Sequence, residues 1–225
     1  MQVRIAPSIL SADFLRLGDE IDILNRSADL VHVDVMDGSF VPNISMGVVV
    51  AEAVAHKTEI PMDVHLMVVH PEKWVERFAK AGAEYVSFHL EAAELAGTDI
   101  HALLQQARSL GVKAGLAFNP DVPVEKAFPY IQDADFILVM SVFAGFSGQK
   151  FIPETVGRVK TLKQEITRLG SSCMIEVDGG VSPDNAAALR DAGADILVAA
   201  SSVYRHEDRG AAIEALRAAA SPREV

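Results

Sequence analysis

The chain has 225 residues, of which 50% are hydrophobic and 23% are charged, so it can bury a substantial core and is not a disordered segment. Its 31 acidic and 20 basic residues give a formal net charge of −11, which opposes nucleic acid as a main partner but permits a small phosphate ligand. Cys173 is the only cysteine, which excludes an intrachain disulfide.

The N-terminal stretch 1–14 lacks a basic region followed by a long apolar run, which a signal peptide would have. The apolar runs elsewhere are strand-sized and too short to cross a bilayer as a helix. We therefore expect a cytoplasmic protein with no membrane partner.

Short apolar runs alternate with longer amphipathic stretches along the whole chain. In chain order, the predicted strands are 3–9, 30–36, 62–68, 85–90, 113–118, 136–140, 173–177 and 195–200. Between them, helical patterns cover 13–26, 71–82, 102–111, 153–170 and 185–193. We expect the last residues, 218–225, to fray.

Four segments resemble one another: SADLVHV, AGAEYVSF, DADFILV and AGADILV. Each ends a helix with small residues, places an acid and starts a strand; the acids are Asp29, Glu84, Asp135 and Asp195. Regular alternation of strand and helix predicts parallel strands, and eight such units predict one α/β domain over 1–225, a (β/α)8 TIM barrel. A doubly wound open sheet is the alternative.

In a barrel of this kind, functional side chains lie at the carboxyl ends of the strands. In the strand at 30–36, His32, Asp34 and Met36 alternate with valines and therefore share one face. A buried imidazole and carboxylate need partners, and a shared metal would supply one. The plainer interpretation is a hydrogen-bonded His–Asp pair in the core.

The strand at 62–68 repeats this pattern, with Asp63, His65 and Met67 on one face. A second histidine on the adjacent strand brings two imidazoles within reach of one ion, although His65 alone would be read as a core histidine. Asp63 lies earlier in its strand, so we expect it to support the site or to be structural.

The strand at 173–177 leads into Asp178, Gly179 and Gly180, and the two glycines let the backbone approach a ligand closely. An ordinary Asp-Gly turn is the plainer interpretation. Two histidines and two aspartates, His32, Asp34, His65 and Asp178, suit one divalent ion of Zn, Fe, Mn or Co. Such an ion would acidify a C–H group beside a carbonyl and stabilise the enediolate.

Glycine-bearing loops late in the chain suggest a phosphate site. They follow the strands ending near 140, 178 and 200, a common place for phosphate in such barrels. Each loop taken singly is equally well read as a plain turn. Met36, Met67 and Met140, near strand ends, are either core filler or a water-poor floor for the substrate.

With these residues assembled, the sequence closely resembles the ribulose-phosphate 3-epimerase family over almost its whole length. The matching blocks are APSILSADF, HVDVMDGSFVPN, DVHLMV, FHLEA, GLAFNP, VMSV, GFSGQKFIPE, EVDGGV and AGADILVA. The resemblance implies reversible inversion at C3 of D-ribulose 5-phosphate to give D-xylulose 5-phosphate, in pentose phosphate metabolism.

The resemblance also implies roles for individual residues. Asp34 would accept the proton on one face and Asp178 would donate one on the other, as inversion requires. His32, Asp34, His65 and Asp178 would hold the metal. The expected substrate and phosphate contacts are Ser8, Met36, His65, Met67, Met140, Gly145, Phe146, Ser147, Gly148, Gly179, Gly180, Ala200 and Ser201. A homo-oligomer, either a dimer or a hexamer, is expected.

The chain departs from the usual family pattern at Ser39, Phe143–Ala144, Ser147 and Ala200, all expected in or near loops over the substrate. A 3-epimerase of a related ketose phosphate, such as a six-carbon ketose 6-phosphate, is therefore an alternative. A decarboxylase or Schiff-base lyase is disfavoured because the site strands carry no lysine. A non-catalytic sugar-phosphate binder is disfavoured because all four proposed ligands are kept.

Overall fold

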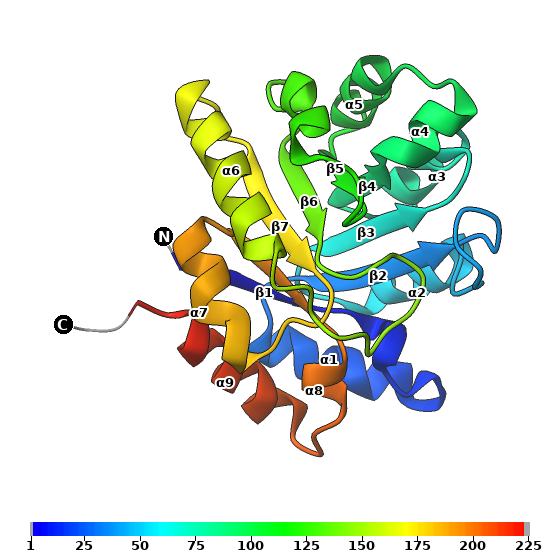
Figure 1. Cartoon of the computed structure of the whole chain (residues 1–225). Coiled ribbons are helices and arrows are strands. Elements are labelled where there is room, and N and C mark those ends of the chain that lie inside the picture. Colours follow the sequence, from blue (N-terminus) through cyan, green and yellow to red (C-terminus); the bar gives the residue numbers. More distant parts are fainter. Residues whose placement is uncertain (1, 223–225) are drawn as a thin grey trace.

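The structure is a computed structural model that describes residues 2–222, in which eight strands form a barrel surrounded by helices (Figure 1). The strands are β1 (Arg4–Pro7), β2 (Val31–Met36), β3 (Met62–Met67), β4 (Tyr85–His89), β5 (Lys113–Phe118), β6 (Phe136–Met140), β7 (Met174–Asp178) and β8 (Ile196–Ala199). Their order is β1-β8-β7-β6-β5-β4-β3-β2, and every ladder is parallel.

The two end strands of this order, β1 and β2, meet at a seam that closes the sheet. Ser8 pairs with His32 in a parallel bridge. Lower in the seam, the N–H groups of Asp29 and Leu30 donate to the carbonyl of Ile5 at 3.0 and 3.3 Å. The predicted single-domain (β/α)8 barrel is confirmed, and the open-sheet alternative is wrong, because an open sheet leaves its end strands unpaired.

The helices return the chain to the start of the next strand. They are α1 (Leu17–Ser27), α2 (Val48–Lys57), α3 (Val75–Lys80), α4 (Leu90–Ala96), α5 (Ile100–Ser109), α6 (Thr155–Arg168), α7 (Pro183–Ala192), α8 (Ser201–Tyr204) and α9 (Arg209–Ala220). Short 3₁₀ segments lie at Ile9–Ser11, Phe14–Arg16, Pro71–Lys73 and Val124–Tyr130. Within residues 2–222, none of the helices is long and apolar enough to cross a membrane.

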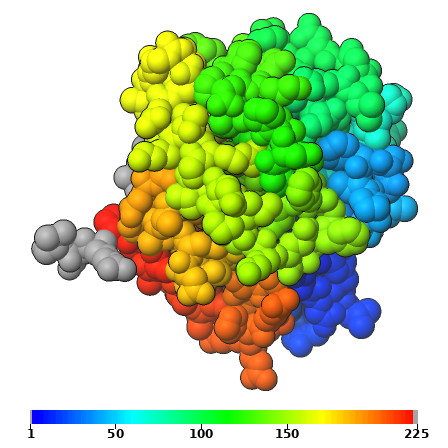
Figure 2. Space-filling model, viewed as in Figure 1, coloured from blue at the N-terminus to red at the C-terminus, as the bar shows by residue number. Residues whose placement is uncertain are grey.

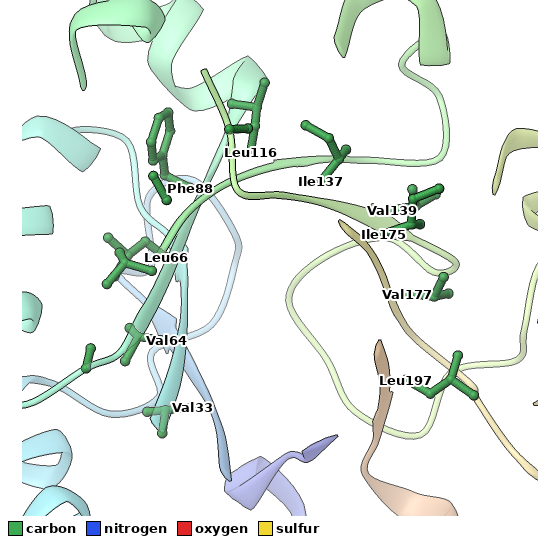
Figure 3. Close-up of a cluster of buried hydrophobic side chains, with 14 of the residues drawn as sticks. Val33, Val64, Leu66, Phe88, Leu116, Ile137, Val139, Ile175, Val177 and Leu197 are labelled. Atoms are coloured by element: carbon green, nitrogen blue, oxygen red, sulfur yellow. The ribbon is translucent and has the colours of Figure 1, made fainter. Parts of the chain in front are cut away.

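Successive side chains along each strand point to opposite sides of the barrel wall. The valine, leucine, isoleucine and phenylalanine side chains labelled in Figure 3 lie on the outer side, where they belong to the large core under the helices. Their neighbours point inward, and at the amino ends of the strands the interior is filled by apolar side chains that include Tyr85, Phe136 and Ile196. The polar inward side chains therefore gather at the carboxyl ends.

The acids of the repeated segments tie neighbouring strands together at the amino ends. Asp29, Asp135 and Asp195 each accept a hydrogen bond from a backbone N–H of the preceding odd-numbered strand, at 2.8 to 2.9 Å. Glu84 lies at the equivalent position but makes the contact through its backbone: its N–H donates to the carbonyl of Met62 at 2.9 Å. The sequence repeat therefore marks a repeated backbone contact.

All eight predicted strands are present, with ends that differ by two residues or fewer. Helix α2 was missed because its run of three valines, 48–50, has strand-like composition and no helical periodicity. The connection from β5 to β6 is a 3₁₀ segment containing Pro129, which has no N–H to donate. The predicted fraying is wrong for 218–220, which end α9, and at 223–225 it lies outside the described residues.

Candidate active site and metal centre

Four side chains converge at the carboxyl end of the barrel. Asp34 Oδ1 lies 3.4 Å from His32 Nε2 and 3.2 Å from His65 Nδ1. Asp178 Oδ2, from β7, lies 3.8 Å from His65 Nδ1. One ligand atom from each of these four residues lies within 4.8 Å of all the others. The side chains that the sequence analysis grouped from three separate strands therefore form one cluster.

The donor atoms of this cluster fit a divalent metal. His32 and His65 are fully buried, and His32 Nε2 has no hydrogen-bond partner among the described residues although it faces the cluster. An unsatisfied buried nitrogen is costly unless something binds it. Two imidazole nitrogens and two carboxylates are a donor set suited to zinc, iron, manganese or cobalt. The cluster could therefore hold one metal ion.

The two aspartates of the cluster have pKa values that are shifted in opposite directions. Burial acts to raise the pKa of Asp34, but His32 and His65 outweigh it and hold that pKa well below its usual value. Burial and the nearby Asp34 carboxylate raise the pKa of Asp178 to about 7. Neighbours of opposite charge at Asp34 and of like charge at Asp178 therefore distinguish the two carboxyls.

Behind the cluster, Asp63 holds the far side of His32. Its Oδ2 lies 2.6 Å from His32 Nδ1, so Asp63 supports the histidine as the sequence suggested. Glu176 lies 3.8 Å from the same Nδ1 and is fully buried. Burial, followed by the Asp63 carboxylate, raises the pKa of Glu176 well above its usual value. Sequence analysis did not identify Glu176, although it is the inward residue before Asp178.

Most of the expected substrate contacts line one pocket above the cluster, and Asp34 and Asp178 form part of its wall. The expected contacts found in this lining are Met36, Met67, Met140, Gly145, Phe146, Ser147, Gly148, Gly179, Gly180, Ala200 and Ser201. Ser8 and His65 lie beneath this lining, both buried. Ser8 Oγ donates to Asp34 Oδ2 at 2.5 Å and so touches the site through that carboxylate.

The loop between β6 and α6 crosses the mouth of the barrel. Asn43 Nδ2 donates to the carbonyl of Gly145 at 3.2 Å, and the hydroxyls of Ser11 and Ser147 lie 2.6 Å apart. Figure 1 shows this yellow-green loop in front of the strands, and Figure 2 shows its atoms over the middle of the same face. The loop therefore roofs the pocket and contacts the segments that follow β1 and β2.

Two glycines after β7 allow this loop to pack closely. Gly179 has a φ of +119°, and a Cβ there would lie 2.4 Å from Val142 Cγ2. Gly180 has a φ of +62°, and its Cβ would lie 2.6 Å from the backbone nitrogen of Phe151. Any larger residue would push the roof away from the pocket.

The end of β4 supplies a histidine that the sequence analysis did not single out. His89 Nε2 lies 2.9 Å from His65 Nε2, and Glu91 Oε2 lies 3.5 Å from His89 Nδ1. The signal was present in the sequence, because Ser87 and His89 alternate inward as His32 and Asp34 do. It was missed because β4 pairs with β3 and not with the strands that carry Asp34 and Asp178.

Comparison with known proteins agrees with this geometry. A model of the ribulose-phosphate 3 epimerase family matches residues 4–204. The chain is 45% identical to the ribulose-phosphate 3-epimerase of Bacillus subtilis (strain 168), covering 96% of this chain and 98% of the relative. It is 44% identical to the chloroplastic ribulose-5-phosphate-3-epimerase of Arabidopsis thaliana, covering 98% of this chain and 78% of the relative.

Solved structures with low identity share the fold. The orotidine 5′-phosphate decarboxylase from Pyrococcus horikoshii OT3 superposes with a TM-score of 0.68 at 13% identity, covering 96% of this chain and 98% of that one. A 3-hexulose-6-phosphate synthase gives a TM-score of 0.70 at 17% identity, covering 98% of this chain and all of the other. These likenesses support the barrel alone, because one fold serves many reactions.

Proposed function

Because this chain belongs to the ribulose-phosphate 3-epimerase family, and is therefore an isomerase, we propose that it converts D-ribulose 5-phosphate to D-xylulose 5-phosphate by inverting C3. The observation that carries the proposal is the pair of carboxylates, Asp34 and Asp178, in the wall of one pocket. Inversion needs one proton acceptor and one proton donor on opposite faces of the carbon, since a single base tends to return the proton to its original face.

The two aspartates divide this work. Asp34 accepts the C3 proton of ribulose 5-phosphate, because its carboxylate is ionised beside His32 and His65. Asp178, the other carboxyl in the wall of the pocket, delivers a proton to the opposite face. In the reverse direction the two residues exchange roles.

His32, Asp34, His65 and Asp178 would hold one divalent metal ion, as the unsatisfied His32 Nε2 supports. When bound, this ion supplies a Lewis acid that acidifies the C3–H group and stabilises the enediolate. The residues around it exclude water: Met36, Met67 and Met140 are buried beside the aspartates. The loops after β6, β7 and β8 would receive the phosphate with backbone N–H groups.

Exchange of the C3 hydrogen with solvent tests the roles that we propose for Asp34 and Asp178. In D₂O, the wild-type protein should incorporate deuterium at C3 and form xylulose 5-phosphate. Asp178→Asn should still exchange deuterium into ribulose 5-phosphate, because Asp34 remains, while product formation falls about 100- to 10,000-fold. Asp34→Asn should lose both exchange and product formation from this substrate.

The control for this experiment is Asp37→Asn, which changes a carboxylate outside the pocket lining. It should retain exchange and turnover. If the metal-loaded wild-type protein showed neither deuterium uptake nor xylulose 5-phosphate, the proposed reaction would be wrong. If Asp178→Asn retained full turnover, the proposed role of Asp178 would be wrong.

The substrate alternative is a related ketose phosphate, such as a six-carbon ketose 6-phosphate. Its support is that Phe143, Ala144, Ser147 and Ala200, which depart from the family pattern, all line the pocket. Ser39 is outside this lining. Comparing kcat/KM for five- and six-carbon ketose phosphates decides between them. The cytoplasmic setting and the homo-oligomeric state stay predictions from the sequence.

A further inference from the structure

The two histidines of the metal centre present different ring nitrogens to it. His32 turns Nε2 toward Asp34, and its Nδ1 is held by Asp63 at 2.6 Å. His65 is reversed: Nδ1 faces Asp34 at 3.2 Å, and Nε2 contacts His89 Nε2 at 2.9 Å. Each ring therefore has one nitrogen in the site and the other engaged by a buried partner, but the partner of His65 is itself a histidine.

His65 and His89 meet edge to edge. Their ring centroids are 5.0 Å apart and their planes differ by 23°, while the nearest nitrogens are 2.9 Å apart. If the rings were stacked face to face, their centroids would be about as far apart as their nearest atoms. The centroids are instead much farther apart than the two nitrogens, so the nitrogen–nitrogen contact lies near the planes of both rings, as a hydrogen bond requires. The ring of Phe40 packs on His89 with centroids 4.8 Å apart, which restrains the histidine from turning away.

Glu91 continues the contact beyond His89. Its Oε2 lies 3.5 Å from His89 Nδ1, and both atoms are buried without a hydrogen-bond partner among the described residues. Its Oε1 accepts from the backbone N–H of Asn119 at 2.8 Å. The side chain of Asn119 in turn accepts from the N–H of Ala144, in the loop over the pocket, at 2.9 Å. The carboxylate is therefore anchored on two sides.

One arrangement of protons satisfies these contacts when a metal is bound. A ring nitrogen binds a metal through its lone pair, so His65 Nδ1 must be bare and His65 Nε2 must carry the proton. The 2.9 Å contact needs one donor and one acceptor, so His89 Nε2 accepts. His89 then carries its own proton on Nδ1, which faces the Glu91 carboxylate.

We propose that His89 and Glu91 are positioning residues that hold His65 in the tautomer and orientation that direct Nδ1 to the metal. The proposal rests on the metal centre of the proposed function. Histidine ligands of metals commonly have their second nitrogen fixed by such a partner, and losing that partner weakens metal binding. Here the Glu91 carboxylate acts on His65 through the imidazole of His89. It is also linked through Asn119 to the loop that covers the pocket.

Metal affinity of the stripped protein tests this proposal without using activity. We expect His89→Leu to weaken Co²⁺ and Zn²⁺ binding about 10- to 100-fold in competition with a chelator, because it leaves the His65 Nε2 proton without an acceptor. His89→Gln should bind more tightly than His89→Leu, because its amide oxygen still accepts. Glu91→Ala should weaken binding, whereas Glu91→Gln should retain most of it.

Nitrogen-15 NMR of the zinc-loaded protein gives an independent readout. The His65 ring should be the Nε2–H tautomer in the wild type and a mixture of tautomers in His89→Leu. The control is His101→Leu, which removes another histidine–carboxylate pair, with Asp133 at 2.5 Å, outside the pocket lining. It should change neither readout.

The outcomes separate this proposal from the proposed function. If His32→Ala weakens metal binding while folded His89→Leu and Glu91→Ala bind as the wild type does, His89 and Glu91 only fill space and the positioning role is wrong. If His89→Leu does not fold, Glu91→Ala decides, because Glu91 is partly exposed. If the folded wild type binds neither ion, the metal centre itself is wrong and both proposals fail.

Discussion

At the scale of single residues, three carboxylates of this chain lie in different surroundings. Asp34 lies against two imidazoles, Asp178 lies near another carboxylate, and Asp37 lies against backbone N–H groups. The sequence identified the first two by their place at strand ends. It said nothing of their opposite pKa shifts, because those depend on which charges are brought near by strands far apart in the chain.

Asp37 provides a test of pH dependence outside the metal cluster. Partial burial acts to raise its pKa, but N–H groups of Val69, Phe40 and Ser39 outweigh this and lower it. A carboxyl whose folded pKa lies below its unfolded pKa adds stability that is present above the unfolded value and is lost as pH falls through the folded one. Asp37 should therefore stabilise the protein at neutral pH and not in strong acid.

The variant Asp37→Asn should thus lower the free energy of unfolding near pH 7, and its difference from wild type should shrink as the pH falls below about 4, the usual range for an aspartate. Urea unfolding at several pH values measures this difference. If the difference in unfolding free energy between Asp37→Asn and the wild type stayed constant or grew in acid, these N–H groups would not be stabilising the charge of the carboxylate. Asp121→Asn, at an exposed turn, serves as a comparison.

At the scale of elements, the packing of the barrel interior depends on a small residue on one strand that faces a large side chain on the next strand. Gly115 on β5 faces Phe136 on β6, and a Cβ at Gly115 would lie 2.3 Å from Cζ of that ring. The fully buried Phe136 fills the amino end of the barrel and so forms the floor beneath the polar cluster. The sequence shows a glycine in a predicted strand, but only the pairing of β5 with β6 explains it.

We expect Gly115→Ala to destabilise the protein by about 1–3 kcal/mol, the usual cost of overpacking a core. Unfolding in denaturant measures this loss. The double variant Gly115→Ala/Phe136→Leu should lose less than the sum of the two single variants, because the smaller side chain makes room for the methyl group. Additive losses would mean that the clash with Phe136 is not the cause.

At the scale of the whole molecule, the proposed metal centre joins strands from opposite ends of the chain. His32, His65 and Asp178 lie on β2, β3 and β7, and the Ser8 hydroxyl on the far side of the seam donates to Asp34. A metal that binds only the folded protein stabilises it by mass action. Binding should therefore stabilise the closed barrel as a unit.

Metal at about 100 times its Kd should stabilise the protein by about 2.7 kcal/mol, which raises Tm by roughly 5–11 °C for a chain of this size. Thermal unfolding of the stripped protein with and without Co²⁺ measures the shift. The shift should disappear in His32→Ala and persist in His101→Leu. An equal shift in His32→Ala would place the stabilising metal elsewhere.

The sequence alone determined the alternation of strands and helices and most members of the candidate site. Strand periodicity placed His32, Asp34 and His65 on inward faces, and the place of Asp178 at a strand end added the fourth member. Periods of two and 3.6 residues are local properties, so they can be read without the fold. The same local reasoning missed α2, whose valines suit a strand, and His89, whose partner is on another strand.

Only the tertiary structure decided what depends on neighbours across the barrel. Closure at the seam between Ser8 and His32 separated a barrel from an open sheet. The orientation of His65, with Nδ1 toward the cluster and Nε2 toward His89, appears only in the structure. The surroundings of Asp34 and Asp178 shift the pKa values of the two carboxyls in opposite directions. Each of these joins atoms from different strands, and a distance between strands is not a property of either strand alone.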